Sequence, residues 1–482
     1  MDSDSRRCER CGGGEGVLYL PQSCTCSKPR TKASEALANR RELRRSIISL
    51  AWPVLIEQAL QTVTQMADMM MVSWIGSSAT AAVGLSNHPL FIMQGIFMGL
   101  GTGTTAIVAR FIGAGRKDKA EKTMAQSVAI ATLVGFIVSL VGYLLTPSIV
   151  QFMGAEADVI PLGESYMRAL MPGMFALALN MTVSAALRGA GDAKFPMAVN
   201  AVINAINIVL NYLWIYGKGG FPVMGVTGAA LATTVARIVG TAWMIMGVTR
   251  PDNAVLRLSI RKDFKFDWKL LGRVAHVGLP NSIERSSLSL GIILFVRVVA
   301  SLGTTAYAAH AIAINAEQVS QMAGFAFAVA ATALVSRGLG AEDTEFAANA
   351  GWEAWKMSAV VMGVGALVLF FFPHLLMRMY TADPEIITMG SQVLRIIAIV
   401  QLPMSSAFTL VGALRGAGDT RAVLAFILTA VWLVRLPLVH LFVRVFGWGL
   451  AGAWVAMAVD WCTRGTVGMV RFRKGKWKSM RI

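Results

Sequence analysis

The feature that most constrains this chain is an internal repeat. The seven residues ALRGAGD occur twice, as Ala186–Asp192 and as Ala413–Asp419, and 413 minus 186 gives an offset of 227 residues. A period of this length is far above the roughly 20 to 50 residues of solenoid repeats, so it predicts a duplicated domain with two homologous halves. The same offset aligns further residues of the two halves: Pro53 with Pro280, Glu57 with Glu284, Gly113 with Gly340, and Arg168 with Arg395.

Long apolar stretches follow one another along almost the whole chain after residue 46. Of the 482 residues, 55% are hydrophobic and only 15% are charged, with a mean hydropathy of +0.59, whereas soluble domains carry about 25% charged residues. Roughly 20 apolar residues of helix cross the hydrocarbon core, and a helix satisfies its own backbone hydrogen bonds there. We therefore predict an all-α polytopic membrane protein with twelve transmembrane helices, over 47–72, 86–112, 124–147, 160–187, 194–216, 225–249, 274–300, 308–336, 353–376, 386–414, 420–445 and 448–470.

Each predicted half has six spans, an even number, so both halves enter the membrane from the same side. Halves of this kind are related by a pseudo-twofold axis along the membrane normal, as in some transporters. ALRGAGD then lies at the cytoplasmic ends of the fourth and tenth spans, where its glycines are expected to end the helices. Proline removes a backbone hydrogen bond from a helix, so we expect bends at Pro172, Pro403 and Pro437.

The formal net charge of +17 is distributed in a way that indicates membrane topology. Arg and Lys gather at the two ends of the chain, in a loop near Arg116 and in a central linker. This positive-inside pattern places both termini in the cytoplasm of a cell-membrane protein, and it explains the charge better than nucleic-acid binding does. The expected parts are a cytoplasmic cysteine-containing tail 1–46, a first lobe 47–249, a cytoplasmic linker 250–273, a second lobe 274–470 and a basic cytoplasmic tail 471–482.

The N-terminal tail holds four of the five cysteines, Cys8, Cys11, Cys24 and Cys26. Two closely spaced cysteine pairs can ligate zinc through four thiolates, and a reducing cytoplasm disfavours disulfides. The alternative is an adventitious cluster in a polar tail, because the second pair is more tightly spaced than zinc ligands usually are. Both interpretations stay open.

Two stripes of polar residues lie inside predicted spans. The first span carries Glu57, Gln61, Thr64 and Asp68, and the fifth carries Asn200, Asn204, Asn207 and Asn211. Spacings of three and four residues keep each set on one helical face. A charge at the centre of a membrane helix costs about 2.5–3.5 kcal/mol on insertion scales. The stripes therefore favour a hydrated, ion-binding cavity, and the alternative is a structural polar network between helices.

The second half does not repeat the first stripe. Glu284 matches Glu57, but the positions that match the other three residues hold Leu288, Gly291 and Phe295. The charged residues predicted to be buried in this half are Arg297, Arg435 and Asp460, of which the last two are placed to form an ion pair. The halves are thus expected to share a fold and to differ in chemistry.

No enzyme site is expected. The chain has no P-loop and no nucleophile–base or metal pattern such as HExxH, and Gly101-x-Gly103 lies inside an apolar span without a βαβ context. His310 is interpreted as a helix-interface residue. We therefore expect a monomeric transporter of small molecules, surrounded by membrane lipid, with no cofactor other than a coupling ion.

Several motifs, in order along the chain, are typical of one transporter family. They are AWPVLIEQ, GLGTGTTAIVARFIGAG, both copies of ALRGAGD, INIVLNYLWIYG, GLPNSIE and SLGTTAYAAHAIA. From about residue 46 to residue 478 the chain resembles the multidrug and toxic compound extrusion (MATE) family, most closely its DinF-like branch. The resemblance implies two six-helix lobes forming a V, and export of amphiphilic, often cationic, molecules in exchange for H⁺ or Na⁺ by alternating access. It also implies that Asp68 couples the ion, with Asn180 and Asn207 near it.

The chain departs from the family at three positions. Some relatives carry an acid where this chain has Asn211, one branch places its seventh-span acid at the position of Leu288, and relatives often have Gln in place of Ala311. The sodium site of that branch is therefore not expected here. Asp68 is the expected proton-binding residue, and Glu57 is the second candidate. The alternative function is a lipid-linked or oligosaccharide flippase of a related fold, whose strongly cationic cavity the acidic and amide stripes argue against.

Overall fold

The structure is a computed structural model that describes residues 32–153, 158–250, 255–258 and 267–480. The chain divides into two compact units, Met1–Glu42 and Leu43–Ile482. The described part of the first unit consists of the opening turns of helix α1, and the rest of α1 and all the other helices belong to the second unit. The four tail cysteines lie outside the described residues.

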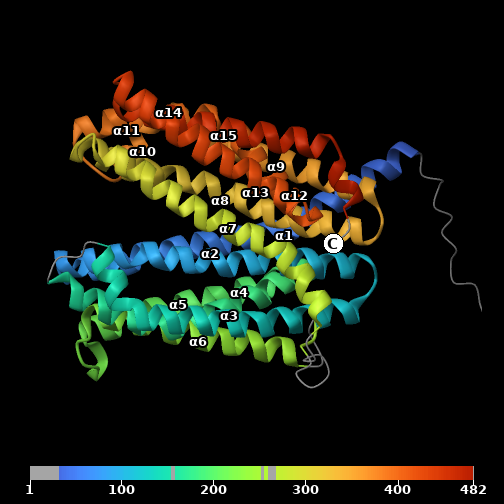
Figure 1. Cartoon of the computed structure of the whole chain (residues 1–482), viewed down its shortest axis with the longest axis horizontal. Coiled ribbons are helices and arrows are strands. Elements are labelled where there is room, and N and C mark those ends of the chain that lie inside the picture. The colour runs from blue at the N-terminus through green and yellow to red at the C-terminus, as the bar shows by residue number, and fades with distance from the viewer. Residues whose placement is uncertain (1–31, 154–157, 251–254, 259–266, 481–482) are drawn as a thin grey trace, which may run out of the picture. The chain divides into compact units, whose positions relative to one another are not determined.

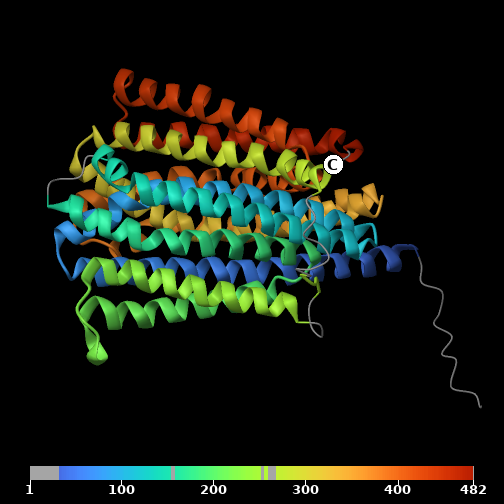
Figure 2. The same ribbon diagram turned by 60° about the horizontal axis from the view of Figure 1, so that its bottom comes forward.

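Every described element is helical, and the long helices of both halves run side by side (Figures 1 and 2). The first half forms α1 (Lys32–Ser73), α2 (Ser77–Gly113), α3 (Lys117–Phe152), α4 (Val159–Ala190), α5 (Lys194–Tyr216) and α6 (Gly225–Thr249). The second half forms α7 (Trp268–Ala300), α8 (Thr304–Gly340), α9 (Thr344–Phe371), α10 (Pro373–Arg378), α11 (Pro384–Ile399), α12 (Gln401–Ala417), α13 (Thr420–Leu428), α14 (Leu436–His440) and α15 (Gly449–Arg473).

Each of the twelve predicted spans coincides with one helix or with a run of consecutive helices, which confirms the all-α membrane fold. In the described part of the chain, nine helices are long and apolar enough to cross a membrane, and α11 with α12 makes a tenth if the pair counts as one bent span. Two helices outside that set, α7 and α15, carry charged residues within their apolar stretches. They complete the six spans of the second half.

Several helices extend beyond the spans expected from the sequence. The described part of α1 begins at Lys32, inside the tail predicted to end at residue 46, because Ala, Glu, Leu and Arg there favour helix. The side chain of Asp267 accepts a hydrogen bond from Leu270 N at 3.2 Å, so α7 starts six residues before the predicted 274. At the other end α15 continues to Arg473, inside the predicted basic tail.

The two ALRGAGD copies end α4 and α12, as their glycines predict. Gly191 and Gly418, which follow the last residues of these helices, have φ of +100° and +93°. Residues with a Cβ rarely adopt this left-handed conformation, whereas glycine does so without a steric clash. The repeat therefore marks the same helix end in both halves, and we call this end of the helix bundle the ALRGAGD end.

The three prolines at which bends are expected have different effects. α11 and α12 meet at a bend of 55° close to Ile399, whose carbonyl would have accepted the hydrogen bond that Pro403 cannot donate. The π-helical segment Thr429–Arg435 precedes Pro437 for the same reason. In contrast, α4 continues through Pro172 without interruption.

Glycines on α2 let the two halves approach closely along α2 and α7. Gly95, Gly99 and Gly103 are four residues apart and share one face of the helix. A Cβ atom on Gly99 would lie 2.7 Å from the carbonyl oxygen of Gly278, and one on Gly103 would lie 2.5 Å from that of Val274. Small residues are required at such contacts because the helix backbones nearly touch.

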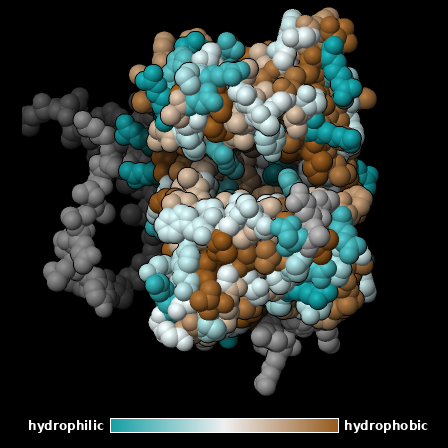
Figure 3. All heavy atoms as spheres, turned by 90° about the vertical axis from the view of Figure 1, so that its left-hand side faces the viewer, coloured by the Kyte–Doolittle hydropathy of each residue, from teal (hydrophilic) through white to brown (hydrophobic). Residues whose placement is uncertain are grey.

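The halves also meet at the ALRGAGD end, where α2 and α8 finish. A Cβ on Gly113 would lie 1.9 Å from the carbonyl oxygen of Arg337, and one on Gly340 would lie 1.9 Å from that of Arg110. The two contacts are related by the repeat offset, so the closure is symmetrical. Figure 3 looks at the opposite end of the bundle and shows a surface hollowed between the halves, with hydrophilic residues inside the hollow.

The C-terminal tail packs on the helices, which its basic composition does not predict. Trp477 is 1% exposed, stacks on Phe472 with ring centroids 4.7 Å apart, and donates its Nε1 hydrogen to the Phe472 carbonyl at 2.8 Å. Arg110 Nη2 on α2 donates to the Met480 carbonyl at 2.6 Å. The tail of the second half thereby reaches the first half at the ALRGAGD end.

Candidate functional site

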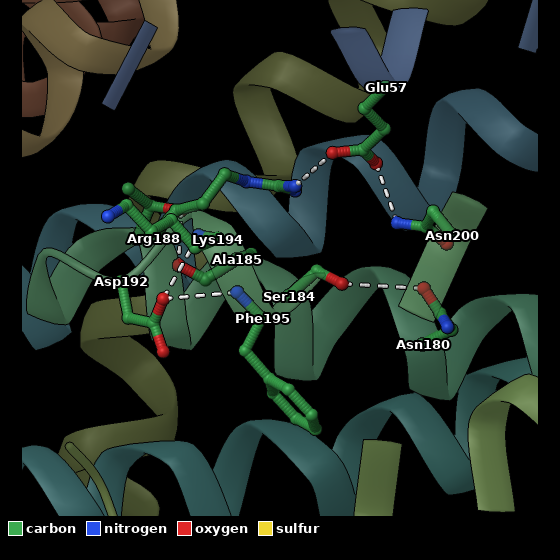
Figure 4. Close-up of polar contacts among 10 residues, drawn as sticks. Glu57, Asn180, Ser184, Ala185, Arg188, Asp192, Lys194, Phe195 and Asn200 are labelled. Atoms are coloured by element: carbon green, nitrogen blue, oxygen red, sulfur yellow. Dashed lines mark hydrogen bonds and ion pairs between the residues drawn. The ribbon is translucent and has the colours of Figure 1, made fainter. Parts of the chain in front are cut away.

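Glu57 on α1 is held by two side chains of the first half (Figure 4). Arg188 Nη1 on α4 lies 3.3 Å from Glu57 Oε2, and Asn200 on α5 donates its Nδ2 hydrogen to Oε1 at 2.7 Å. Arg188 is the arginine of the first ALRGAGD copy. The ion pair therefore fixes the end of α4 against α1.

The second ALRGAGD copy makes the same ion pair. Arg415 Nη2 on α12 lies 2.5 Å from Glu284 Oε1 on α7, and both positions follow the repeat offset from Arg188 and Glu57. The presence of the pair in both halves, which otherwise differ in their buried polar residues, favours a helix-positioning role. The sequence contained the signal, since the glutamate and the arginine repeat at one offset, but it did not show that they meet.

Asp68, near the other end of α1, is bound by amides from α5. Asn211 donates its Nδ2 hydrogen to Asp68 Oδ1. With the Asn207 amide oriented so that both its ends are satisfied, Asn207 Nδ2 donates to the same oxygen at 3.0 Å, and its oxygen accepts from Thr233 Oγ1 on α6 at 2.9 Å. Charge-assisted hydrogen bonds to the carboxylate thus join α1 to α5, and the neutral bond of Asn207 with Thr233 links this pair to α6.

A half-buried cation accompanies this carboxylate. Arg237 on α6 lies close enough to Asp68 to interact electrostatically, although no nitrogen–oxygen pair of the two comes within 4.0 Å. Its Nη1 contacts the sulfur of Met174 at 3.5 Å. Arg237 was not predicted as a site residue, and the signal that was available was an arginine in the middle of the sixth span.

The polar stripe of α1 forms two separate clusters. Asp68 follows Glu57 by 11 residues, which is about 16 Å of helix at 1.5 Å per residue. Between them Thr64 donates to the carbonyl oxygen of Leu60 in its own helix at 2.9 Å, and Gln61 is exposed. The first stripe therefore does not line one continuous network, because its central residues turn to their own backbone or to the surface.

Two further predicted asparagines stand apart from the hydrogen bonds of Asp68. Asn180 on α4 is buried and accepts a long bond from Ser184 Oγ at 3.4 Å, and its Nδ2 has no acceptor among the described residues (Figure 4). Asn204 on α5 is half-buried, and its side chain forms no hydrogen bond with any residue that the structure describes. A buried amide without an acceptor is unusual, so Asn180 is placed to bind water or a ligand.

The second half contains a different charged cluster. Asp460 on α15 lies 2.6 Å from Arg435 Nη2, and it accepts two hydrogen bonds from Arg464, at 2.8 Å from Nε and 2.6 Å from Nη2. All three residues are buried. The predicted pair of Arg435 with Asp460 is confirmed, and Arg464 is a third member that was not predicted from the sequence.

The prediction that Arg297 is buried is wrong. Arg297 is exposed and lies in the last turn of α7. A basic side chain in the last turn complements the partial negative charge of the helix C-terminus. The sequence showed that Arg297 lies within an apolar stretch but not that the helix ends three residues later.

His310 is a buried helix-interface residue, as expected. Trp454 on α15 donates its Nε1 hydrogen to His310 Nδ1 at 3.1 Å. In the described residues no group of three or more His, Cys, Asp or Glu side chains is placed to hold a metal ion. The zinc hypothesis for Cys8, Cys11, Cys24 and Cys26 concerns residues outside that part and stays a prediction.

Comparisons with known proteins agree with this architecture. The MatE family model matches residues 53–213 and 280–441, once in each half. The chain is 32% identical to "Probable multidrug resistance protein NorM" of Thermotoga maritima, over 92% of this chain and 94% of that protein.

Two solved structures share the fold. One, described as "Crystal structure of MATE in complex with MaL6", has a TM-score of 0.85 at 23% identity and covers 90% of this chain and 96% of its own. The other, from Pyrococcus furiosus, is described with the words "Reverse polarity of binding pocket suggests different function of a MOP superfamily transporter". It has a TM-score of 0.84 at 24% identity and covers 90% of this chain and 95% of its own.

Proposed function

The chain belongs to the MatE family, the multidrug and toxic compound extrusion transporters, and on this premise we propose that it exports small amphiphilic molecules in exchange for protons. The observation that carries the proposal is the Asp68 site. A single carboxylate on α1 is bound by two amides of α5 and lies near Arg237 of α6. It is a titratable group at a junction of three membrane helices.

Proton binding at Asp68 changes how tightly α1 is held. The ionised carboxylate accepts two charge-assisted hydrogen bonds from Asn207 and Asn211. A proton removes the negative charge, so these bonds weaken to the strength of neutral ones, and the attraction to Arg237 is lost. A proton that binds one arrangement of the helices better than another shifts the equilibrium between them by that difference in affinity.

The opening of the bundle supports the export cycle. The halves touch at the ALRGAGD end and are hollowed apart at the other end (Figure 3). The positive-inside pattern of the sequence assigns the ALRGAGD end to the cytoplasm. In this orientation the bundle is closed on the cytoplasmic side and open on the outer side. An exporter adopts such an arrangement when it releases its substrate to the outside.

We assign the chain to the DinF-like branch, working as a monomer, on the motifs of its sequence. The flippase alternative has one observation in its favour, which is the number of arginines inside the second half. Three carboxylates near those arginines, Glu284, Glu317 and Asp460, offset most of that charge. Export of amphiphiles with proton coupling is the better fit to the Asp68 site.

The test is transport by purified protein in liposomes with H⁺ and Na⁺ gradients imposed separately. We expect the H⁺ gradient to drive export and Asp68→Asn to abolish it, while substrate binding persists. The control is Asp118→Asn, which changes an exposed acid at the start of α3. Full proton-driven export by Asp68→Asn would move the assignment to Glu57, and export driven by Na⁺ alone would replace the proton as the coupling ion.

A further inference from the structure

The interior of the second half contains a cluster with more arginines than carboxylates. Its arginines are Arg285 on α7, Arg415 on α12, Arg435 at the end of the π-helical segment and Arg464 on α15. Its carboxylates are Glu284, Glu317 and Asp460. Arg285 interacts electrostatically with Arg415, Glu284 and Arg464, and Glu317 interacts with Arg435. We call these seven residues the arginine cluster.

The ion pairs inside the arginine cluster leave one arginine, Arg285, without an ion pair of its own. Arg415 pairs with Glu284, and Arg435 and Arg464 share Asp460. Glu317 accepts from Gln321 at 2.9 Å. Arg285 has no carboxylate within 4.0 Å among the described residues. Even with all three carboxylates ionised, four arginines leave one positive charge in excess.

Three of the arginines also have an unused donor. The Nε atoms of Arg285, Arg415 and Arg435 are buried and have no hydrogen-bond acceptor in the described part of the chain. Arg435 as a whole is only 6% exposed. A buried guanidinium donor without an acceptor loses the hydrogen bond that it makes in water, so it is strongly disfavoured unless something binds to it.

The fold itself does not require the extra arginines. At the repeat offset of 227, Arg285 and Arg435 correspond to Gln58 and Ile208 in the first half, and at the offset of 224 that applies to the last helix Arg464 corresponds to Gly240. Only the pair of Glu284 with Arg415 occurs in both halves. Because the first half folds in the same way without the other charges, these charges serve something specific to the second half.

Arg285 lies on the seam between the two halves. Its Cβ is 3.2 Å from the position that a Cβ on Gly95 would occupy, so Arg285 sits against α2, along the seam of the two halves. Arg435 ends a π-helical segment, and such segments occur frequently at functional sites. The guanidinium fork matches the planar, two-oxygen face of an oxyanion and binds it through paired hydrogen bonds.

We propose that the arginine cluster binds the oxyanion group, a carboxylate or a sulfonate, of an amphiphilic substrate. The substrate is then anionic or zwitterionic, and its charged group supplies the missing counter-ion and the missing acceptors. The statement that the oxyanion belongs to an exported amphiphile rests on the proposed function, whereas the statement that the arginine cluster binds an oxyanion does not.

The experiment compares two fluorescent probes that differ in one charged group. Both are dansyl sulfonamides, one of taurine, which carries a sulfonate, and one of 2-aminoethyltrimethylammonium, which carries a cation. Binding to the purified full-length protein is measured by fluorescence titration, with methanesulfonate as a competing free anion. We expect the sulfonate probe to bind tighter than the cationic probe, and Arg285→Gln to weaken it by about tenfold or more, as for loss of a charge-assisted bond.

Arg285 is the residue to change because its removal leaves no carboxylate without its ion-pair partner. Arg285→Lys keeps the charge without the fork and is expected to bind the sulfonate with intermediate affinity. The control Arg297→Gln removes an exposed arginine from the same helix and is expected to leave binding unchanged. If Arg285→Gln does not fold, the comparison of wild type with Arg285→Lys still tests the site.

The outcomes separate this inference from the export function. Equal affinity for the sulfonate probe in wild type, Arg285→Lys and Arg285→Gln overturns the inference. Tighter binding of the cationic probe than of the sulfonate probe by wild type also overturns it, even if the protein exports the cation in exchange for protons. Arg285-dependent sulfonate binding without export in liposomes supports the site and refutes the export function. Methanesulfonate binding as tightly as the probe supports an oxyanion site and overturns the assignment to an amphiphile.

Discussion

The two ALRGAGD ion pairs provide a direct test of how burial sets the cost of an unpaired charge. The change is Arg415→Leu in the second half and Arg188→Leu in the first. In the second half the side chain of Glu284 is 2% exposed and its partner Arg415 is 13% exposed. In the first half the values are 18% for Glu57 and 17% for Arg188, and Glu57 keeps its hydrogen bond from Asn200 at 2.7 Å.

These differences set the expected magnitudes. Removing one partner of a buried ion pair leaves an uncompensated charge and costs about 3–5 kcal/mol, which is the range we expect for Arg415→Leu. Arg188→Leu removes one charge-assisted contact from a carboxylate that still has an amide donor and partial access to water, at about 1–3 kcal/mol. The second-half variant should therefore be less stable by about 2 kcal/mol, or a factor of roughly 30 in the unfolding equilibrium.

The assay is unfolding by sodium dodecyl sulfate in mixed micelles, followed by circular dichroism. The double replacement of Glu284 and Arg415 by leucine is the control, because it removes the stranded charge, and it should recover most of the stability lost in Arg415→Leu. The reasoning is refuted if Arg188→Leu costs as much as Arg415→Leu, or if the double replacement is no more stable than the single one.

Three further predictions concern the ends of the bundle. Gly113→Leu should separate α2 from α8, because its Cβ would lie 1.9 Å from the Arg337 carbonyl oxygen. The distance between spin labels in the loops 114–116 and 341–343 should then increase. An unchanged distance would contradict the close contact of the two halves at this end. Lys122, 2.7 Å from Asp267, holds the pKa of that carboxyl below its ordinary value. This contact therefore stabilises the fold above the ordinary pKa of about 4, and the contribution disappears as the pH falls through the lowered pKa; in Lys122→Met the unfolding temperature should lose this part of its pH dependence. Deleting residues 1–39 should leave membrane insertion and export intact, whereas deleting 1–46 should reduce the amount of folded protein, because it also removes the buried Leu43 and the ion pair of Arg44 with Glu353.

The helices of this protein were predictable because the features that define them are local. Apolar stretches long enough to cross the bilayer give the spans, and each span coincides with one helix or a run of helices. The glycines of ALRGAGD end α4 and α12 because only residues without a Cβ adopt their positive φ readily. The distortions at Pro403 and Pro437 follow from a hydrogen bond that proline cannot make.

Most partners of the charged residues were not predictable, because they depend on how each helix is rotated about its axis and on which helix lies beside it. The sequence placed Glu57 and Asp68 on one face of α1, but the tertiary structure assigned them to different partners, Arg188 and Asn211. The sequence also grouped Arg297, Arg435 and Asp460 as buried charges. The predicted pair of Arg435 with Asp460 is confirmed, whereas the end of α7 leaves Arg297 exposed. The length of an apolar stretch and the stereochemistry of the backbone depend only on residues that are neighbours in the chain. The sequence by itself therefore determined the helices, their ends and their proline distortions. The ion pair of Glu57 with Arg188 joins residues 131 positions apart, so only the packed helices decided it.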